Sequence, residues 1–274
     1  MEALMGTQNW LYDTILYMYA LSLLFYFSDF MDANRRAKRI GTGLLIFVWI
    51  LQTVFLVIRI FDHLEMTSIS TFEYWLGFSW LLVTISLVIS RFFKIEFIVF
   101  LVNIVGFAVL ALNMYSLPGE ESRLALSSTM RELLFVHISL ILCAYAALTV
   151  GAIFAGMYLF LHQQLKDKRW SKYVRRFPSL DTIERYSDRA IIIGVPLLAM
   201  SLSVAVTLLL IEGQTSLLLD WKVVSSFAAL VMYIIYVVQR AMLNRPGTQL
   251  ARLHVLAFFV LILNLLSNFI SAFH

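Results

Sequence analysis

Eight apolar stretches recur along the chain, each close to the ~20 residues that an α-helix needs to cross a lipid bilayer. They span about 10–28, 40–61, 72–90, 96–115, 131–161, 188–211, 220–238 and 253–273. Hydrophobic residues make up 61% of the chain, above the ~45–50% of a soluble domain. A bilayer interior forces backbone groups to pair within the segment. The sequence therefore predicts an all-α integral membrane protein, an eight-transmembrane-helix bundle that forms one polytopic domain over 1–274.

Positive charge alternates between the predicted connections. Of the 21 Lys and Arg residues, 17 follow the first, third, fifth and seventh spans. The positive-inside rule then places both the N-terminus and the C-terminus outside, in a multi-pass protein of the cell membrane. The net charge of +4 is explained by this topology, and we expect no nucleic-acid partner.

The longest connection is a basic cytoplasmic loop at about 162–187. It carries Trp170 and Tyr173 among its cations, a composition that suits contact with anionic membrane lipid. Retention of the loop on the cytoplasmic side explains the same charges. Pro178 and Ser179 interrupt the chain, and the spacing of Asp181 and Glu184 is that of a capping box at the start of the next helix.

Polar residues inside the spans are spaced so that they share helix faces. On the second span Gln52, Arg59 and His63 follow intervals of seven and four residues. On the last span the stripe comprises Asn264, Ser267, Asn268, Ser271 and His274. Both stripes end at the outer side in a histidine, and His137 lies near the outer end of the fifth span. Interhelical hydrogen bonding explains such stripes. Histidines at helix ends commonly bind no ligand, and three of them at one face are also compatible with a metal or haem site.

Other local signals concern packing and chemistry. Ala147, Gly151 and Ala155 on the fifth span form a ridge of small residues that allows another helix to approach closely. The metalloprotease HExxH pattern, the phosphate-binding loop, the GxSxG nucleophile pattern and the dinucleotide fingerprint are all absent from the sequence. A single cysteine, Cys143, provides no disulfide framework. We therefore expect a protein that is not an enzyme.

The order of certain segments resembles the cytochrome c assembly family typified by CcsA and ResC. The resemblance covers roughly 60–274 and is most specific between Pro178 and Leu198. It rests on the segment that begins at His137, on Pro178-Ser-Leu-Asp181 with Ser187, Arg189, Gly194 and Pro196, on Asp62-His63 with Phe72-Glu73-Tyr74 and Phe78-Ser79-Trp80, and on Leu263-Asn264-Leu265-Leu266 with His274.

The resemblance implies a haem cofactor. In this family two outward-facing histidines flank a tryptophan-rich loop and hold haem for delivery to apocytochrome. By position His137 resembles the first and His274 the second, while His63 resembles a further histidine that serves haem within the helices. Of the family's WGxxWxWD-type loop this chain keeps Asp220 and Trp221. Asn264 and Asn268 of the polar stripe would orient ligand histidines by hydrogen bonding.

The shortened loop resembles that of a bacterial branch of the family encoded alongside haem biosynthesis enzymes. This implies a membrane protein that lowers the amount of glutamyl-tRNA reductase, with a cytoplasmic or membrane partner in haem biosynthesis. Haem bound by the outer histidines would shift the helices, and the loop from His162 to Arg189 would relay that state. Two alternatives stay open: a cytochrome c assembly factor or haem transporter, and a membrane scaffold without haem.

Overall fold

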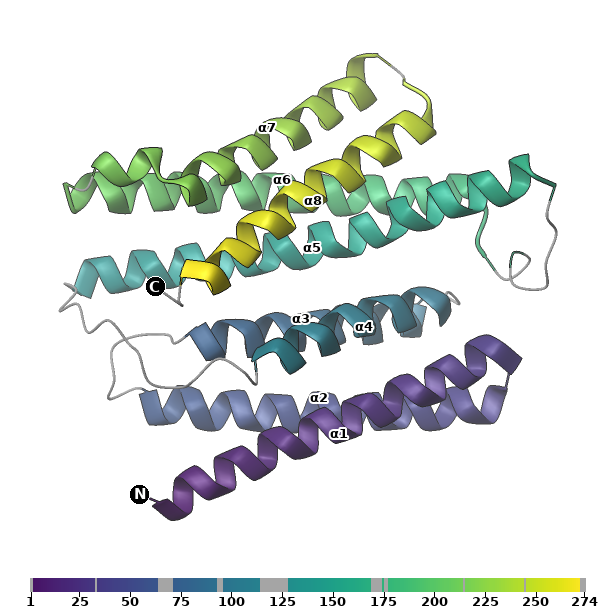
Figure 1. Cartoon of the computed structure of the whole chain (residues 1–274), viewed down its shortest axis with the longest axis horizontal. Helices are drawn as coiled ribbons and strands as arrows, with labels where there is room; N and C mark the ends of the chain where they lie inside the picture. Colours follow the sequence, from purple (N-terminus) through teal and green to yellow (C-terminus); the bar gives the residue numbers. More distant parts are fainter. Residues whose placement is uncertain are drawn as a thin grey trace. The chain divides into compact units, whose positions relative to one another are not determined.

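The computed structural model describes residues 2–32, 34–63, 71–92, 96–113, 128–168, 174, 177–213, 215–243 and 245–271. Within these ranges the chain is helical and contains no strand, so the predicted all-α class is confirmed (Figure 1). The elements are α1 Glu2–Asp32, α2 Arg35–His63, α3 Thr71–Phe92, α4 Glu96–Asn113, α5 Ser128–Lys166, α6 Leu180–Ile211, the 3-10 helix η2 Thr215–Leu219, α7 Trp221–Met242 and α8 Gly247–Ser271.

The eight predicted membrane helices correspond in order to α1–α8. Seven of them are long and apolar enough to cross a membrane, and the apolar part of α4, Phe97–Asn113, is shorter. At ~1.5 Å per residue the 39 residues of α5 extend about 58 Å, well beyond a hydrocarbon core of ~30 Å. Helix α5 must therefore tilt or project from the bilayer. The orientation of the termini stays a prediction.

The start of α6 differs from the expected capping box. Ser179 is the N-cap, and its hydroxyl accepts a hydrogen bond from the Thr182 backbone N–H. Asp181 instead pairs with Arg185 one turn later at 2.7 Å, and Glu184 is drawn away from the cap by Arg240 on α7. The helix thus begins at Leu180, because the Ser179 hydroxyl satisfies a backbone donor there. The two carboxylates do not cap the helix, since each pairs with an arginine.

The described residues fall into two compact units, 1–125 and 126–274. The prediction that both belong to one polytopic membrane domain stays a prediction. In the first unit, polar side chains join the helices in pairs. Tyr19 of α1 donates to Asn103 of α4 at 2.9 Å, and Gln52 of α2 donates to Ser79 of α3 at 3.2 Å. Gln52 of the predicted stripe therefore acts as interhelical hydrogen-bond glue.

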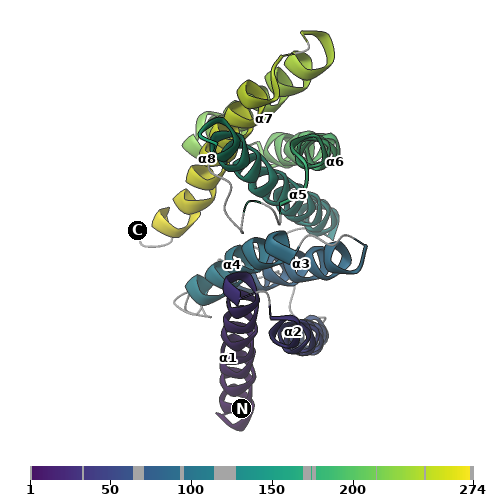
Figure 2. The ribbon, with the colours of Figure 1, turned by 90° about the vertical axis from the view of Figure 1, so that its right-hand side faces the viewer.

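In the second unit α5 lies between α6 and α8 (Figure 2). The predicted ridge explains this packing. A Cβ atom added to Gly151 would lie 2.7 Å from His254 Cε1 on α8 and 2.9 Å from Ala190 Cβ on α6. The absence of a side chain at Gly151 lets both neighbours approach α5 closely.

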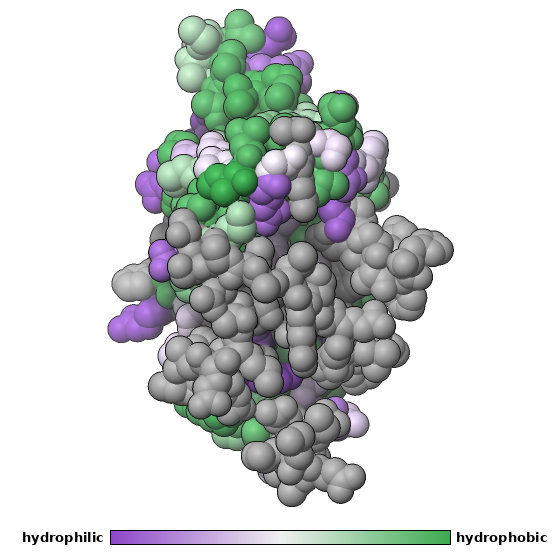
Figure 3. Space-filling model, turned by 90° about the vertical axis from the view of Figure 1, so that its left-hand side faces the viewer, coloured by the Kyte–Doolittle hydropathy of each residue, from purple (hydrophilic) through white to green (hydrophobic). Residues whose placement is uncertain are grey.

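Large apolar side chains also face outward, as a lipid-exposed surface requires. On α7 the exposed residues include Val224, Val231, Ile234, Ile235 and Val238. Figure 3 shows hydrophobic side chains, in green, at the surface of this unit. Such outward-facing apolar side chains are typical of helices surrounded by lipid.

Candidate functional site

The helices of the second unit alternate in direction, which gives the unit two chemically different ends. We call the end where α5 and α7 begin and α6 and α8 finish the His137 end. The opposite end, where α5 and α7 finish and α6 and α8 begin, is the Lys166 end. Four sequence-predicted site residues belong to the His137 end: His137, Asp220, Trp221 and Asn264.

His137 is clasped to α6 by Ser201. Its Nδ1 lies 2.9 Å from the Ser201 carbonyl oxygen and 2.9 Å from the Ser201 hydroxyl, and that hydroxyl donates to the His137 carbonyl at 3.2 Å. Since a carbonyl can only accept, Nδ1 carries the proton in this arrangement. The lone pair then belongs to Nε2, and in this tautomer the imidazole can bind a metal through Nε2.

Asn264 ties three helices together near the same end. The Tyr145 hydroxyl of α5 donates to Asn264 Oδ1 at 3.3 Å. The Asn264 amide nitrogen lies 2.7 Å from the Lys222 carbonyl and 2.6 Å from the Ser225 hydroxyl, both in the first turns of α7. A buried amide with partners for both its nitrogen and its oxygen fixes the relative positions of α5, α7 and α8.

Asp220 and Trp221 stand at the start of α7, beside this hydrogen-bonded group. Asp220 is the N-cap residue and makes no side-chain capping bond. The Trp221 side chain is 64% exposed and Leu219, just before it, is 84% exposed. The carbonyl of the next residue, Lys222, accepts from Asn264. The retained Asp-Trp pair is thereby held next to Asn264 of α8 and presents an apolar ring outward.

The structure does not describe the side chains of the other predicted site residues. His63 is the last residue of α2 in the first unit, and its side chain lies outside the described residues. Asn268 lies in α8 with a side chain that is likewise outside the described part, and His274 is beyond it altogether. Of the three predicted haem histidines, the structure thus describes the surroundings of His137 alone.

One buried histidine escaped sequence reasoning. His254 of α8 is fully buried, and its Nδ1 lies 3.0 Å from the Ser187 hydroxyl of α6, which in turn donates to the Gly151 carbonyl at 3.2 Å. The rings of Tyr233 and Tyr236 meet the imidazole edge-on, with centroids 5.6 and 5.8 Å away. His254 is therefore a core residue that joins α6, α7 and α8, and the small-residue ridge was the only signal that pointed toward it.

A second group outside the prediction is an ion-pair cluster between α6 and α7. Arg240 contacts Glu184 at 2.5 Å and Asp188 at 2.7 Å. The Tyr236 hydroxyl donates to the other Asp188 oxygen at 2.6 Å. From the sequence, Arg240 was counted only as a topology-setting cation. Its two carboxylate partners on a neighbouring helix make it a structural residue as well.

Comparisons with known proteins identify a family and two relatives. Residues 69–274 match the family described as Cytochrome C assembly protein. The chain is 38% identical to Protein HemX of Brevibacillus brevis over 270 residues, which cover 98% of this chain and 99% of that protein. It is 34% identical to Protein HemX of Bacillus subtilis (strain 168) over 259 residues, 94% of each.

Proposed function

The chain belongs to the cytochrome c assembly protein family, and we propose that this HemX-type membrane protein binds haem through His137 and thereby affects the level of glutamyl-tRNA reductase. The observation that carries the proposal is the Ser201 clasp, which holds the His137 imidazole in one orientation with Nε2 as the available lone pair. Haem, when bound, supplies an iron that takes axial imidazole ligands.

The surroundings of His137 fit such a group. The imidazole is part-buried, so part of the side chain is open to a ligand. The exposed Leu219 and Trp221 belong to the same end of the unit and offer apolar contact for a porphyrin. His274 is the proposed second ligand and His63 a further haem histidine, both from the family resemblance. Cell-membrane localisation and an outward-facing His137 end belong to the same proposal.

The proposed link to the cytoplasm runs through α5 and α6. Helix α5 continues without interruption from His137 to Lys166, and α6 runs from Ser201 back to Leu180. The basic loop was predicted at about 162–187, but both of its ends are helical in the structure, so the connection between α5 and α6 at the Lys166 end is only 167–179. A ligand that repositions the His137–Ser201 clasp would therefore move α5 against α6 and alter the loop. By linkage, a partner that binds the loop must change haem affinity by the same factor.

A second candidate function is haem transport or cytochrome c assembly, which the matched family favours. It would use the same histidine end, and it additionally requires a route for haem through the helices or a partner that receives it. Cells that lack a transporter would accumulate less haem outside, with unchanged glutamyl-tRNA reductase. Cells that lack a regulator would contain more of the reductase.

The test is a haem titration of the detergent-purified protein followed by visible spectroscopy. Wild type should develop the Soret and low-spin bands of axially ligated haem. His137→Ala should abolish them, whereas Ser201→Ala should weaken binding by less than ~10-fold, because it removes the Ser201 hydroxyl and keeps the backbone carbonyl that accepts from Nδ1. His162→Ala, which changes a histidine at the other end of the same helix, is the matched control. Parallel titrations of His63→Ala and His274→Ala identify the remaining ligands.

An unchanged titration in His137→Ala would remove the proposed site. If no variant and not even the wild type binds haem, the scaffold alternative replaces the proposal. The regulatory part is tested separately by immunoblotting glutamyl-tRNA reductase in cells that carry each variant. A normal reductase level with His137→Ala, in protein shown to have lost haem, would disprove the proposed coupling.

A further inference from the structure

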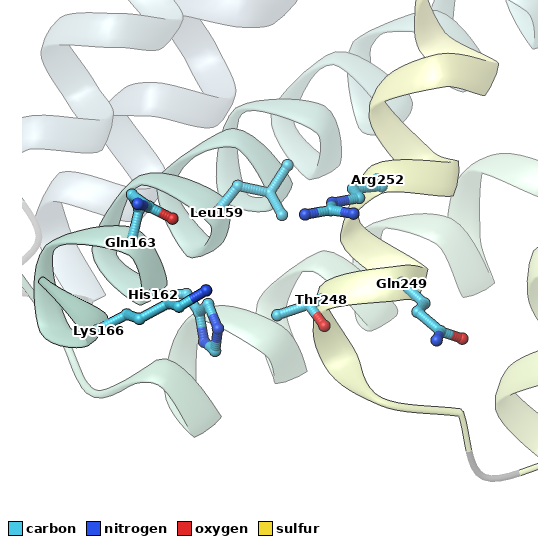
Figure 4. A pocket seen from close by; sticks show the side chains of 7 residues that line it. All are labelled: Leu159, His162, Gln163, Lys166, Thr248, Gln249 and Arg252. Atoms are coloured by element: carbon cyan, nitrogen blue, oxygen red, sulfur yellow. The ribbon is translucent and has the colours of Figure 1, made fainter.

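At the Lys166 end, a pocket of about 370 Å³ lies beside the contact between α5 and α8. Figure 4 shows side chains from both helices around it. The two helices approach closely next to the pocket: a Cβ on Gly247 would lie 2.5 Å from the Tyr158 hydroxyl and 2.6 Å from Glu184 Oε2, a carboxylate that pairs with Arg240. The polar lining consists of His162, Gln163 and Lys166 from α5 and of Thr248, Gln249 and Arg252 from α8.

The lining is cationic and rich in hydrogen-bond donors. Lys166 and Arg252 contribute two positive charges from opposite helices, and no carboxylate is among the lining residues. The neighbouring Asp167 is engaged at 3.1 Å by the Gln163 amide. Thr248 and Gln249 belong to the first turn of α8, where the helix dipole adds further positive potential. Such a set of groups recognises a phosphate or a similar oxyanion.

The pocket lies where two candidate membrane spans end, which is where lipid headgroups are expected. The candidate span of α5 ends at Lys166, and that of α8 begins at Gly247. Along α8, Leu256 and Phe259 follow Arg252 by four and seven residues and so share its face. Both are 57% exposed. An apolar strip therefore continues from the cationic pocket toward the membrane interior.

We propose that this pocket binds the phosphate headgroup of an anionic phospholipid of the phosphatidylglycerol class, whose acyl chain lies along the exposed face of α8. A soluble phosphate would use the cations and would gain nothing from Leu256 and Phe259. A bound lipid would bridge the end of α5 and the start of α8 beside the basic loop. This inference is independent of haem binding, which concerns the opposite end of the unit.

The test is native mass spectrometry of the detergent-purified full chain, titrated with phosphatidylglycerol or with phosphatidylcholine. The variant is Lys166→Gln/Arg252→Gln. The control is Arg35→Gln/Arg36→Gln, which removes the same charge from two exposed cations on α2. Each cation near an anionic lipid surface contributes roughly fivefold in affinity, so the pocket variant should bind phosphatidylglycerol about 25-fold more weakly. Lys166→Arg/Arg252→Lys should restore binding, which also shows that the pocket tolerates substitution.

Selective phosphatidylglycerol binding that is lost in the pocket variant and kept in the control supports the proposal. Equal losses in both pairs would show diffuse electrostatic attraction and overturn it, as would equal binding of phosphatidylcholine. Glycerol 3-phosphate and inorganic phosphate are added as competitors at a tenfold excess over the lipid. Displacement of the lipid by either would assign the pocket to a soluble anion and refute the lipid site.

Discussion

Gly151→Ala tests the packing at the centre of the second unit. The new methyl group would lie 2.7 Å from His254 Cε1 and 2.9 Å from Ala190 Cβ, both closer than a relaxed contact permits. Ala190 Cβ is fixed to its backbone, so relief requires α6 to move away from α5. Overpacking of this kind costs about 1–3 kcal/mol, while alanine in place of glycine returns up to ~1 kcal/mol of helix propensity. The expected net loss in the free energy of unfolding is about 1–2 kcal/mol.

Gly156→Ala is the matched control, five residues further along the same helix. A Cβ at Gly156 meets nothing within 4 Å, so the substitution should be neutral or stabilising by up to ~1 kcal/mol. Unfolding in denaturant, followed by circular dichroism of the detergent-purified protein, compares the two. The double variant Gly151→Ala/Ala190→Gly should recover part of the loss because it removes one of the two close contacts. Equal stability of the Gly151 and Gly156 variants would refute the packing argument.

Three further substitutions probe other contacts, each read by the same unfolding assay. Asn264→Leu should cost about 1 kcal/mol, because it removes an interhelical hydrogen-bonding group and leaves the Tyr145 hydroxyl without its acceptor; wild-type stability would show that these bonds are dispensable. Arg240→Ala should cost about 1 kcal/mol, discounted for the 40% exposure of the side chain. That loss should shrink at high salt, and a salt-independent loss would contradict an ion-pair origin. Gly213→Ala should cost about 1 kcal/mol, because Gly213 has a φ of +69°, whereas Gly43→Ala, in an open helical position, should cost nothing.

The helices were predictable because a chain inside the hydrocarbon core of a membrane has few backbone conformations other than the helix. Their ends were less predictable, because a hydropathy pattern stops where polar residues begin even when the helix continues. Helix α6 shows this plainly, since its first two turns carry Asp181, Arg185 and other polar residues outside the apolar stretch. The N-cap was misassigned for a related reason. Carboxylate spacing alone could not reveal that Glu184 has a cationic partner on α7, 56 residues away.

The candidate site was only partly predictable. Asn264 was predicted as a site residue because helical periodicity is visible within one segment. Its partners on α5 and α7 were not predicted, because they lie on other segments. The Ser201 contact of His137 joins residues 64 positions apart, and the Ser187 contact of His254 joins residues 67 apart. Nothing in either local sequence marks the pairing. His254 also lies only two residues after Arg252, so the sequence placed it at the edge of a predicted membrane span and not in the core.

The contacts between α5 and α6 bear directly on how a haem-linked signal could cross the unit. Beyond the His137–Ser201 clasp, a Cβ on Gly194 of α6 would lie 2.7 Å from Leu148 of α5, and Gly151 approaches Ala190 as closely. Two helices in such close contact cannot separate locally, so a displacement at the clasp must shift them as rigid bodies or be absorbed between Ser201 and Gly194. Pro196 lies within that interval and lacks a backbone donor. The tight contacts beyond it would carry such a displacement toward the start of α6, as the proposed coupling to the basic loop requires.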